Sequence, residues 1–266
     1  YENNGDADEL SNKLSELVSQ NEFNKIKSNE SEGDTRKDYL KLIETYEKNK
    51  TKKTNIKRQK LFFNAIDLMT NGGIADGDFW LVSAYITQGK SEMMKELAYR
   101  QLINGNNVFI GSGEMDKDEY ESRLIVRHTH KFVDGGLSGN KIDTGTLDDK
   151  ERKIKFKDKN LTEEECFKLT CYDWGKNKNY GRVYVVLMGK GETVLDFYRK
   201  IKLWEKIAIN ETGKGFAIIG CDSPQHLTPV KMRNEKRTEL DDVLWDMKQL
   251  CLMTNYKIIG TWWASR

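Results

Sequence analysis

The pattern of hydrophobic and polar positions changes near residue 60. Beyond Phe62, continuous apolar runs alternate with segments whose apolar residues recur at the spacing of a helix. We expect strands at 79–84, 107–112, 183–187, 216–221 and 257–262, and helices at 91–104, 117–131, 193–210 and 236–254. Continuous apolar strands separated by amphipathic helices are typical of a mainly parallel sheet covered on both faces, so the pattern predicts an α/β fold.

The stretch 133–181 breaks this alternation. It begins with glycines, continues with a highly charged segment and contains no clear strand. We therefore expect a long excursion at the rim of the sheet, with a helix at 162–171.

Two short amphipathic helices are predicted before the sheet. Their apolar faces would be formed by Leu10, Leu14, Leu17 and Val18, and by Tyr39, Leu40, Ile43 and Tyr46. Because two short helices bury little apolar surface by themselves, we expect them to pack on another element. The predicted organisation is a short helical arm at 1–58 followed by a core at 59–266.

The charges nearly cancel over the 266 residues. With 44 basic and 42 acidic side chains, the net charge of +2 excludes a protein that is uniformly basic. The total averages an acidic segment at 1–34, with nine acids and three bases, and a run at 48–60 with seven bases and no acid. A solvated helix face or a flexible linker is the ordinary interpretation of such runs.

Cysteine usage and hydropathy bear on the compartment. The four cysteines lack zinc-ribbon spacing, and Cys221 and Cys251 lie in apolar runs, which predicts buried thiols in a reducing compartment. No apolar run approaches the ~18–20 residues that span a membrane, and no signal peptide is visible. We expect a cytoplasmic protein with no membrane partner. The chain begins at Tyr1 rather than Met, which suggests a fragment.

The strongest candidate for chemistry lies between the first predicted strand and its helix. It is a phosphate loop consisting of Ala84, Tyr85, Ile86, Thr87, Gln88, Gly89, Lys90 and Ser91. Backbone N–H groups at a helix N-terminus attract phosphate, Lys90 would reach the β- and γ-phosphates, and Ser91 would ligate Mg²⁺. Ala84 replaces the usual first glycine, and the alternative is a chance strand–turn–helix.

Two carboxylates follow later predicted strands. Asp222 ends the run 216–221 and would lie beside the phosphate loop, holding the metal's water shell, if the two strands are neighbours. Glu114 follows the run 107–112 and would orient or deprotonate the attacking water. The alternatives are an ordinary strand-ending Asp and an ordinary acid at a helix N-terminus.

Together these segments resemble the RecA-like motor domain of DnaB-family replicative helicases. The resemblance rests on residues 77–91 (GDFWLVSAYITQGKS), on the Ser-x-Glu-Met signature at 112–115, on Arg123 and on 239–266. Ala is common in that family at the position of Ala84. Weaker similarity at 64–67 and 72–74 extends the resemblance over roughly residues 60–266.

The resemblance implies a P-loop NTPase that uses ATP and Mg²⁺, most simply a helicase of a phage or a bacterium. Lys90 and Ser91 would bind nucleotide and metal, Asp222 would be the metal-site acid and Glu114 the catalytic base. Hydrolysis would occur between subunits of a homohexameric ring, with the arm clasping a neighbour and single-stranded DNA passing through the centre. A primase or a helicase loader would be a further partner.

Contact with DNA is expected from the basic loop that follows Asp222. Its residues Lys231, Arg233, Lys236 and Arg237 would contact phosphates, and the resemblance also implies a DNA-binding loop there. An ordinary basic surface loop is the alternative. Trp262 and Trp263 are expected to pack rather than to stack on bases. The histidines at 128 and 130 are expected to be surface residues and poor metal ligands, because their spacing puts them on different helix faces.

Two departures keep other functions open. Trp263 stands where the family usually has a Gln that relays nucleotide state to DNA, and the family's remaining elements would follow Arg266, which suggests a core truncated at its C-terminus. The alternatives are a RecA- or KaiC-like ATPase in recombination or regulation, and a degenerate nucleotide-binding protein without turnover.

Overall fold

The computed structural model describes residues 58–85, 88–149, 153–156, 159–230 and 236–264, with isolated positions between 40 and 50. The chain divides into two compact units, Tyr1–Lys57 and Arg58–Arg266. In the first unit, Leu40, Ile43 and Tyr46 are helical and exposed, whereas the predicted helix around Leu10 lies outside the described residues. The second unit carries the sheet and the candidate site.

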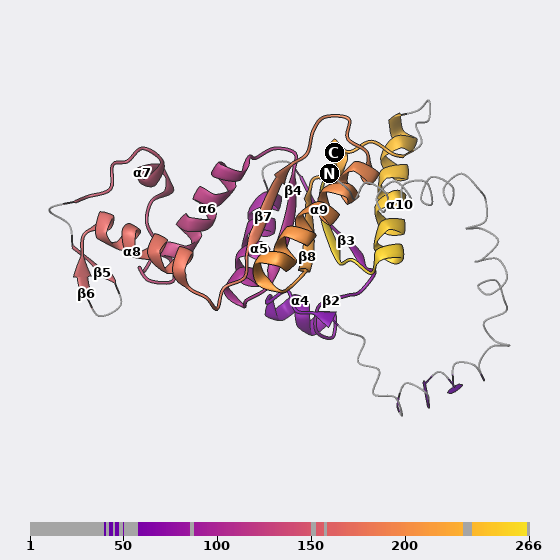
Figure 1. Ribbon diagram of the computed structural model, residues 1–266, viewed down its shortest axis with the longest axis horizontal. Helices are drawn as coiled ribbons and strands as arrows, with labels where there is room; N and C mark the ends of the chain where they lie inside the picture. Colours follow the sequence, from indigo (N-terminus) through magenta and orange to yellow (C-terminus); the bar gives the residue numbers. More distant parts are fainter. Residues whose placement is uncertain are drawn as a thin grey trace. The chain divides into compact units, whose positions relative to one another are not determined.

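A five-stranded parallel sheet forms the centre of this unit (Figure 1). Its strands run in the order β3 (Phe79–Ala84), β9 (Ile258–Trp263), β8 (Phe216–Asp222), β4 (Asn107–Ser112) and β7 (Val183–Leu187). Every neighbouring pair is parallel. The predicted α/β fold with a parallel sheet is therefore confirmed.

Four long helices cover the sheet, and they agree with the predicted positions to within two residues at each end. They are α5 (Lys90–Ile103), α6 (Lys117–Thr129), α9 (Val194–Thr212) and α10 (Lys236–Thr254). Successive side chains of β4 point to opposite faces. Ile110 joins a core cluster with α5, whereas the ring of Phe109 meets Phe197 of α9 at a centroid distance of 5.8 Å. The sheet is thus buried on both faces.

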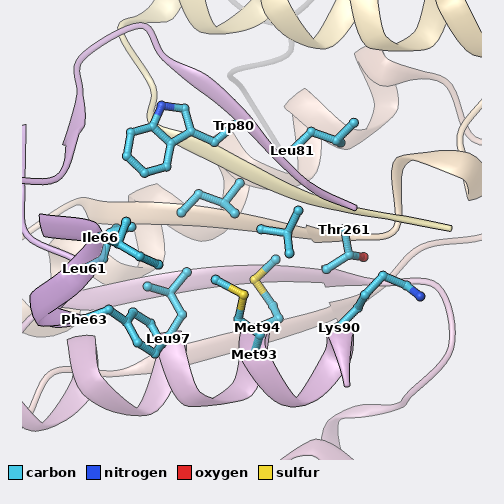
Figure 2. A pocket seen from close by; sticks show the side chains of 12 residues that line it. Leu61, Phe63, Ile66, Trp80, Leu81, Lys90, Met93, Met94, Leu97 and Thr261 are labelled. Carbon is cyan, nitrogen blue, oxygen red and sulfur yellow. The ribbon is translucent and has the colours of Figure 1, made fainter. Parts of the chain in front are cut away.

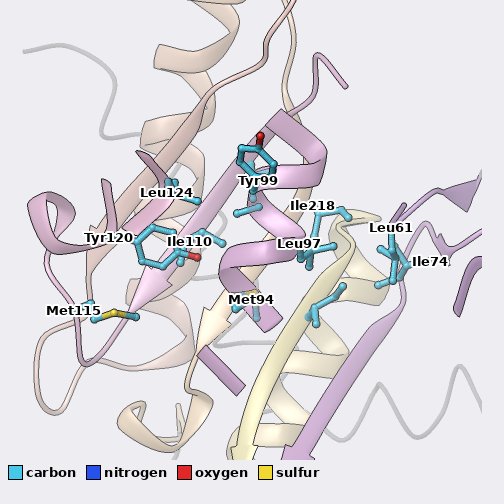
Figure 3. Close-up of a cluster of buried hydrophobic side chains, with 13 residues drawn as sticks. Leu61, Ile74, Met94, Leu97, Tyr99, Ile110, Met115, Tyr120, Leu124 and Ile218 are labelled. Atoms are coloured by element: carbon cyan, nitrogen blue, oxygen red, sulfur yellow. The ribbon is translucent and has the colours of Figure 1, made fainter. Parts of the chain in front are cut away.

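The larger core cluster joins α5 and α6 to the sheet. Figure 3 shows Met94 and Leu97 of α5, Tyr120 of α6, and Ile110 and Ile218 of the sheet packed together. All five side chains are at most 2% exposed. Fully burying such a side chain stabilises the fold by about 1.5–3 kcal/mol, so this cluster fixes the helix that begins at the phosphate loop.

A short segment before β3 closes one end of the sheet. Strand β1 (Arg58–Gln59) pairs antiparallel with β2 (Ile74–Ala75), and α4 (Asn64–Met69) lies between them in sequence. Asp67 accepts hydrogen bonds from the backbone N–H groups of Leu61 and Phe62, both at 2.8 Å. Gly73 has φ +111° and a Cβ there would lie 2.0 Å from the Gln59 carbonyl oxygen, so glycine is required.

The excursion is more ordered than expected. It contains α7 (Gly139–Asp143), an antiparallel hairpin of β5 (Ile154–Phe156) and β6 (Lys159–Leu161), and α8 (Glu163–Lys176). These elements lie beyond α6 from the sheet (Figure 1) and share a small core that includes Phe132, Phe156 and Cys166. The expectation of no strand was wrong, because lysines alternate with the two buried-side residues of a three-residue strand and hide its apolar character.

Helix α8 extends to Lys176, five residues past the expected end. It begins with a capping box in which the Thr162 hydroxyl accepts from the Glu165 N–H and the Glu165 carboxylate accepts from the Thr162 N–H. Within the ranges that the structure describes, no helix is long and apolar enough to cross a membrane.

Candidate nucleotide-binding site

The predicted phosphate loop lies where β3 ends and α5 begins. Gly89 occupies the N-cap position of α5 with φ +81°, a left-handed conformation that favours glycine. The fourteen-residue helix directs its free N–H groups and the positive end of its dipole toward the loop. Of the eight predicted loop residues, Ile86 and Thr87 lie outside the described residues.

Lys90 reaches back across the loop. It is 7% exposed, and its ammonium donates hydrogen bonds to the carbonyl oxygens of Ala84 at 3.0 Å and Tyr85 at 2.8 Å. An ammonium has three N–H donors, so one remains for a phosphate oxygen. Ser91 follows at the next position and is half-buried, and its hydroxyl is a ligand type that Mg²⁺ accepts.

Asp222 ends β8 as predicted, but its strand is not a neighbour of β3. Strand β9 lies between them, so the expectation that Asp222 would follow an adjacent strand was wrong. The hydroxyl of Thr261 on β9 donates to Oδ1 of Asp222 and so joins the two strands at this edge. Strand order depends on which surfaces pack in three dimensions, and the run 216–221 alone does not reveal it.

The second carboxylate oxygen of Asp222 suits a metal site. Asp222 is 2% exposed, and among the described residues its Oδ2 has no hydrogen-bond partner. A buried carboxylate oxygen without a partner is costly, which a cation or a metal-bound water would relieve. The described residues contain no group of three or more His, Cys, Asp and Glu that could hold a metal. A Mg²⁺ ion here would therefore rely on Ser91, Asp222, water and the phosphates themselves.

Tyr120 of α6 lies close to Asp222 and was not predicted. It is fully buried, and burial together with the charge of Asp222 raises the pKa of its hydroxyl well above the ordinary value. The phenol is therefore neutral and available as a hydrogen-bond donor beside the carboxylate. Its position on an amphipathic helix gave no signal of this role.

Glu114 emerges from the sheet one strand away from Asp222. Ser112 of β4 is in register with Asp222 of β8, and the Gly113 N–H donates to the Asp222 carbonyl oxygen at 2.7 Å. The Ser112 hydroxyl accepts from the Met115 N–H at 2.9 Å, which tightens the turn. The Glu114 side chain is 40% exposed and so is open to water. The structure thus brings Glu114 and Asp222 to the same edge of the sheet.

A short 3₁₀ segment, η1 (Pro224–His226), follows Asp222 and connects to the end of β9. The Gln225 side chain accepts from the Trp263 N–H at 2.9 Å and donates to the Trp263 carbonyl oxygen at 3.4 Å. The His226 ring meets the Trp263 indole edge-on, with centroids 5.6 Å apart and planes at 90°. Sequence reasoning missed these contacts because the partners lie far apart along the chain.

An apolar cavity of about 330 Å³ lies between α5 and the strands β3 and β9. Figure 2 shows Lys90 and Thr261 at one end and Leu61, Phe63 and Ile66 at the other. Trp80, Met93, Met94 and Leu97 line its middle. Because its walls are almost entirely hydrocarbon, it suits neither phosphate nor a metal ion. The loop and the strand ends, rather than this cavity, carry the chemistry.

The predicted DNA-binding residues are not brought together by the described structure. Lys231 and Arg233 lie outside the described residues, while Lys236 and Arg237 form the first turn of α10. Trp262 is half-buried and Trp263 is 36% exposed. DNA contact at this loop therefore remains a prediction.

The expectation that both His128 and His130 are surface residues was wrong for His128. Its side chain is fully buried, 3.0 Å from the Tyr99 hydroxyl and 2.9 Å from Asp173. Burial lowers the pKa of His128, although the Asp173 carboxylate opposes that shift. The face of α6 that looked peripheral is covered by α8, which lies far along the chain. His130 is exposed.

Comparisons with known proteins bear on the fold. No protein-family model and no curated protein sequence matches the chain. The structure is similar to the solved ATPase domain of a phage helicase, with a TM-score of 0.64 and 20% identity over 89% of this chain and 73% of that one. It is also similar to a DnaB-like replicative helicase solved for its interactions with primase, with a TM-score of 0.66 and 21% identity. That match covers 95% of this chain and 54% of the helicase chain, so this chain spans about half of it. The chain has the RecA-like α/β fold of these structures.

Proposed function

We propose that the chain is the ATP-hydrolysing core of a DnaB-type replicative helicase. The observation that carries the proposal is the convergence of three groups at the carboxyl edge of one parallel sheet. Lys90 lies at the start of α5, Asp222 keeps a buried oxygen without a partner among the described residues, and Glu114 is open to water one strand away. Phosphate binding, metal binding and water activation require these three kinds of group.

In the proposed reaction, the loop N–H groups and Lys90 bind the β- and γ-phosphates of ATP. Ser91 and Asp222 would hold Mg²⁺, which neutralises charge on the phosphate oxygens. A water oxygen bonds to the γ-phosphorus while the bond to the β–γ bridging oxygen breaks, so ADP leaves. Glu114 accepts the proton that the water loses. Tyr120 and Thr261 keep the Asp222 carboxylate in place.

The assembly is the less supported part of the proposal. A homohexameric ring with single-stranded DNA in its bore follows from the resemblance to DnaB-family helicases, with the arm at 1–58 clasping a neighbour of the core at 59–266. Lys231, Arg233, Lys236 and Arg237 would contact the DNA phosphates. One similar structure was solved for its interactions with primase, which supports a primase as a partner. Such a motor would work in the cytoplasm of a bacterium or a phage-infected cell.

The test is steady-state ATP turnover of the chain with and without single-stranded DNA. We expect DNA to raise the rate and Lys90→Ala to lower it by about 10²-fold or more, since a preorganised positive charge on the phosphates is lost. Lys206→Ala is the matched control, because Lys206 is an exposed lysine of α9. Unchanged turnover in Lys90→Ala would refute the site.

Two other outcomes separate the alternative functions. Turnover that DNA does not change would favour a RecA- or KaiC-like ATPase with a regulatory role. Nucleotide binding without any turnover would favour a degenerate nucleotide-binding protein, for which Trp263 at the sensor position is the supporting feature. Either result would overturn the motor function.

A further inference from the structure

His226 lies next to Glu114 at the carboxyl edge of the sheet. Its Nε2 is 3.9 Å from Oε1 of Glu114, a separation too long for a hydrogen bond and too short to admit a water between the atoms. Nε2 is buried and has no hydrogen-bond partner among the described residues. A buried ring nitrogen without a partner is unfavourable, and the Glu114 carboxylate is the neighbouring group that would satisfy it.

The histidine ring is held while the carboxylate is free to turn. On one side the ring packs edge-on against the Trp263 indole, and Gln225 fixes the backbone of that tryptophan through two hydrogen bonds. On the other side it covers Gly113, where a Cβ would lie 2.3 Å from the ring carbon Cδ2. Glu114 is 40% exposed. A small rotation of Glu114 therefore brings its oxygen to Nε2 without disturbing the sheet.

We propose that His226 is a positioning residue for ATP hydrolysis, whose Nε2–H donates to Oε1 of Glu114 and holds the carboxylate toward the attacking water. This inference rests on the proposed function, because it requires Glu114 to be the base. The other carboxylate oxygen then accepts the proton of the water. Trp263 acts as the support that keeps the imidazole in place.

The position of His226 also explains the shape of the turn at Gly113. Any side chain at residue 113 would occupy the space of the imidazole, so the glycine permits the close approach of η1 to the strand exit. The contact therefore joins the exits of three strands, through Glu114 after β4, His226 after β8 and Trp263 in β9.

The experiment measures kcat and KM for ATP with single-stranded DNA in His226 variants. His226→Leu removes the N–H, whereas His226→Gln retains an amide N–H at similar reach. We expect His226→Leu to lower kcat about 10²-fold, the effect of misplacing a reacting group by about 1 Å, with little change in KM. His226→Gln should retain most of the rate. His226→Asn should not, because its amide is one methylene shorter; it replaces His226→Leu if that variant unfolds.

His130→Leu is the matched control. His130 is exposed at the far end of α6, about 20 Å from the helix start that follows Glu114, at 1.5 Å per residue. We expect its kcat to equal that of the wild type. Equal losses in the His130 and His226 variants would contradict the inference.

A double-mutant cycle with Glu114→Gln separates this inference from the proposed function. If His226 acts through Glu114, His226→Leu should have little further effect in the Glu114→Gln background. The same fold loss in both backgrounds, a change confined to KM, or full activity of His226→Leu would overturn the role of His226 alone. Full activity of Glu114→Gln, or no turnover by the wild-type chain, would instead refute the proposed base and this inference with it.

Discussion

The Thr261 hydroxyl donates a hydrogen bond to the buried carboxylate of Asp222 across the boundary between β9 and β8. Because β9 separates Asp222 from the strand that leads into the phosphate loop, Thr261 occupies the position between the two halves of the candidate site. In the register of the sheet Thr261 lies opposite Val82 of β3, two residues before the loop starts at Ala84. The hydroxyl thus connects the metal-site acid to the strand that carries the loop.

Replacing Thr261 by Val should destabilise the protein. Valine has nearly the same shape but no donor, so Oδ1 of Asp222 would lose its partner as well as Oδ2. We expect the free energy of unfolding to fall by about 1–3 kcal/mol, the cost of leaving a buried acceptor unsatisfied. Urea unfolding measures it. Thr261→Ser keeps the hydroxyl and should lose less; equal losses would show that the methyl group, not the hydrogen bond, matters.

Replacing Gly113 by Ala should produce a clash that a second substitution relieves. The new Cβ would lie 2.3 Å from the His226 ring, and overpacking of this kind costs about 1–3 kcal/mol. The double variant Gly113→Ala, His226→Ala should be more stable than the sum of the single effects predicts, as denaturant unfolding would show.

A glycine in open space provides the control for that substitution. Gly175 lies in α8 with no atom within 4 Å of an added Cβ, so Gly175→Ala should stabilise the protein by about 0.5–1 kcal/mol. Strict additivity in the Gly113 cycle would mean that His226 is not packed on this turn.

The buried His128 should make stability depend on pH. Burial lowers its pKa in the folded state, so the unfolded chain binds more protons as the pH falls below the unperturbed value of about 6.5. The contribution is fully present above that pH and is lost as the pH decreases toward the folded pKa. The charged neighbours Asp173, Lys131 and Arg127 are included in this balance.

We therefore expect the free energy of unfolding to decrease from about pH 7 to about pH 5, and His128→Gln to reduce that slope. Unfolding curves at several pH values measure it. His130→Gln changes an exposed histidine and should keep the wild-type slope. Parallel pH profiles for the wild type and His128→Gln would contradict the assignment.

Sequence reasoning located the long elements well because their signals are local. Residues 194–212 and 236–254 are amphipathic over many turns, and the runs that form β4 and β8 are apolar throughout. The β5–β6 hairpin escaped because three-residue strands with alternating lysines give too little periodicity. His128 escaped because the element that buries one face of α6 is α8, and that packing has no trace in the sequence of α6 itself.

The candidate site divides in the same way. Lys90 and Gly89 were predictable because a loop that binds phosphate needs its residues next to one another in sequence. Strand order, and with it the relation of Asp222 to Thr261, depends on packing between distant segments. The contact of His226 with Glu114 likewise joins residues far apart in the sequence, so only the folded chain reveals it.

The central claim is that Glu114 activates water for the hydrolysis of ATP bound at Lys90. The most direct measurement is the rate of ATP hydrolysis by Glu114→Gln under conditions in which its binding of a fluorescent ATP analogue equals that of the wild type. We expect a rate lower by about 10²–10⁴-fold, the usual contribution of a general base, with binding preserved. A rate equal to that of the wild type would contradict the claim.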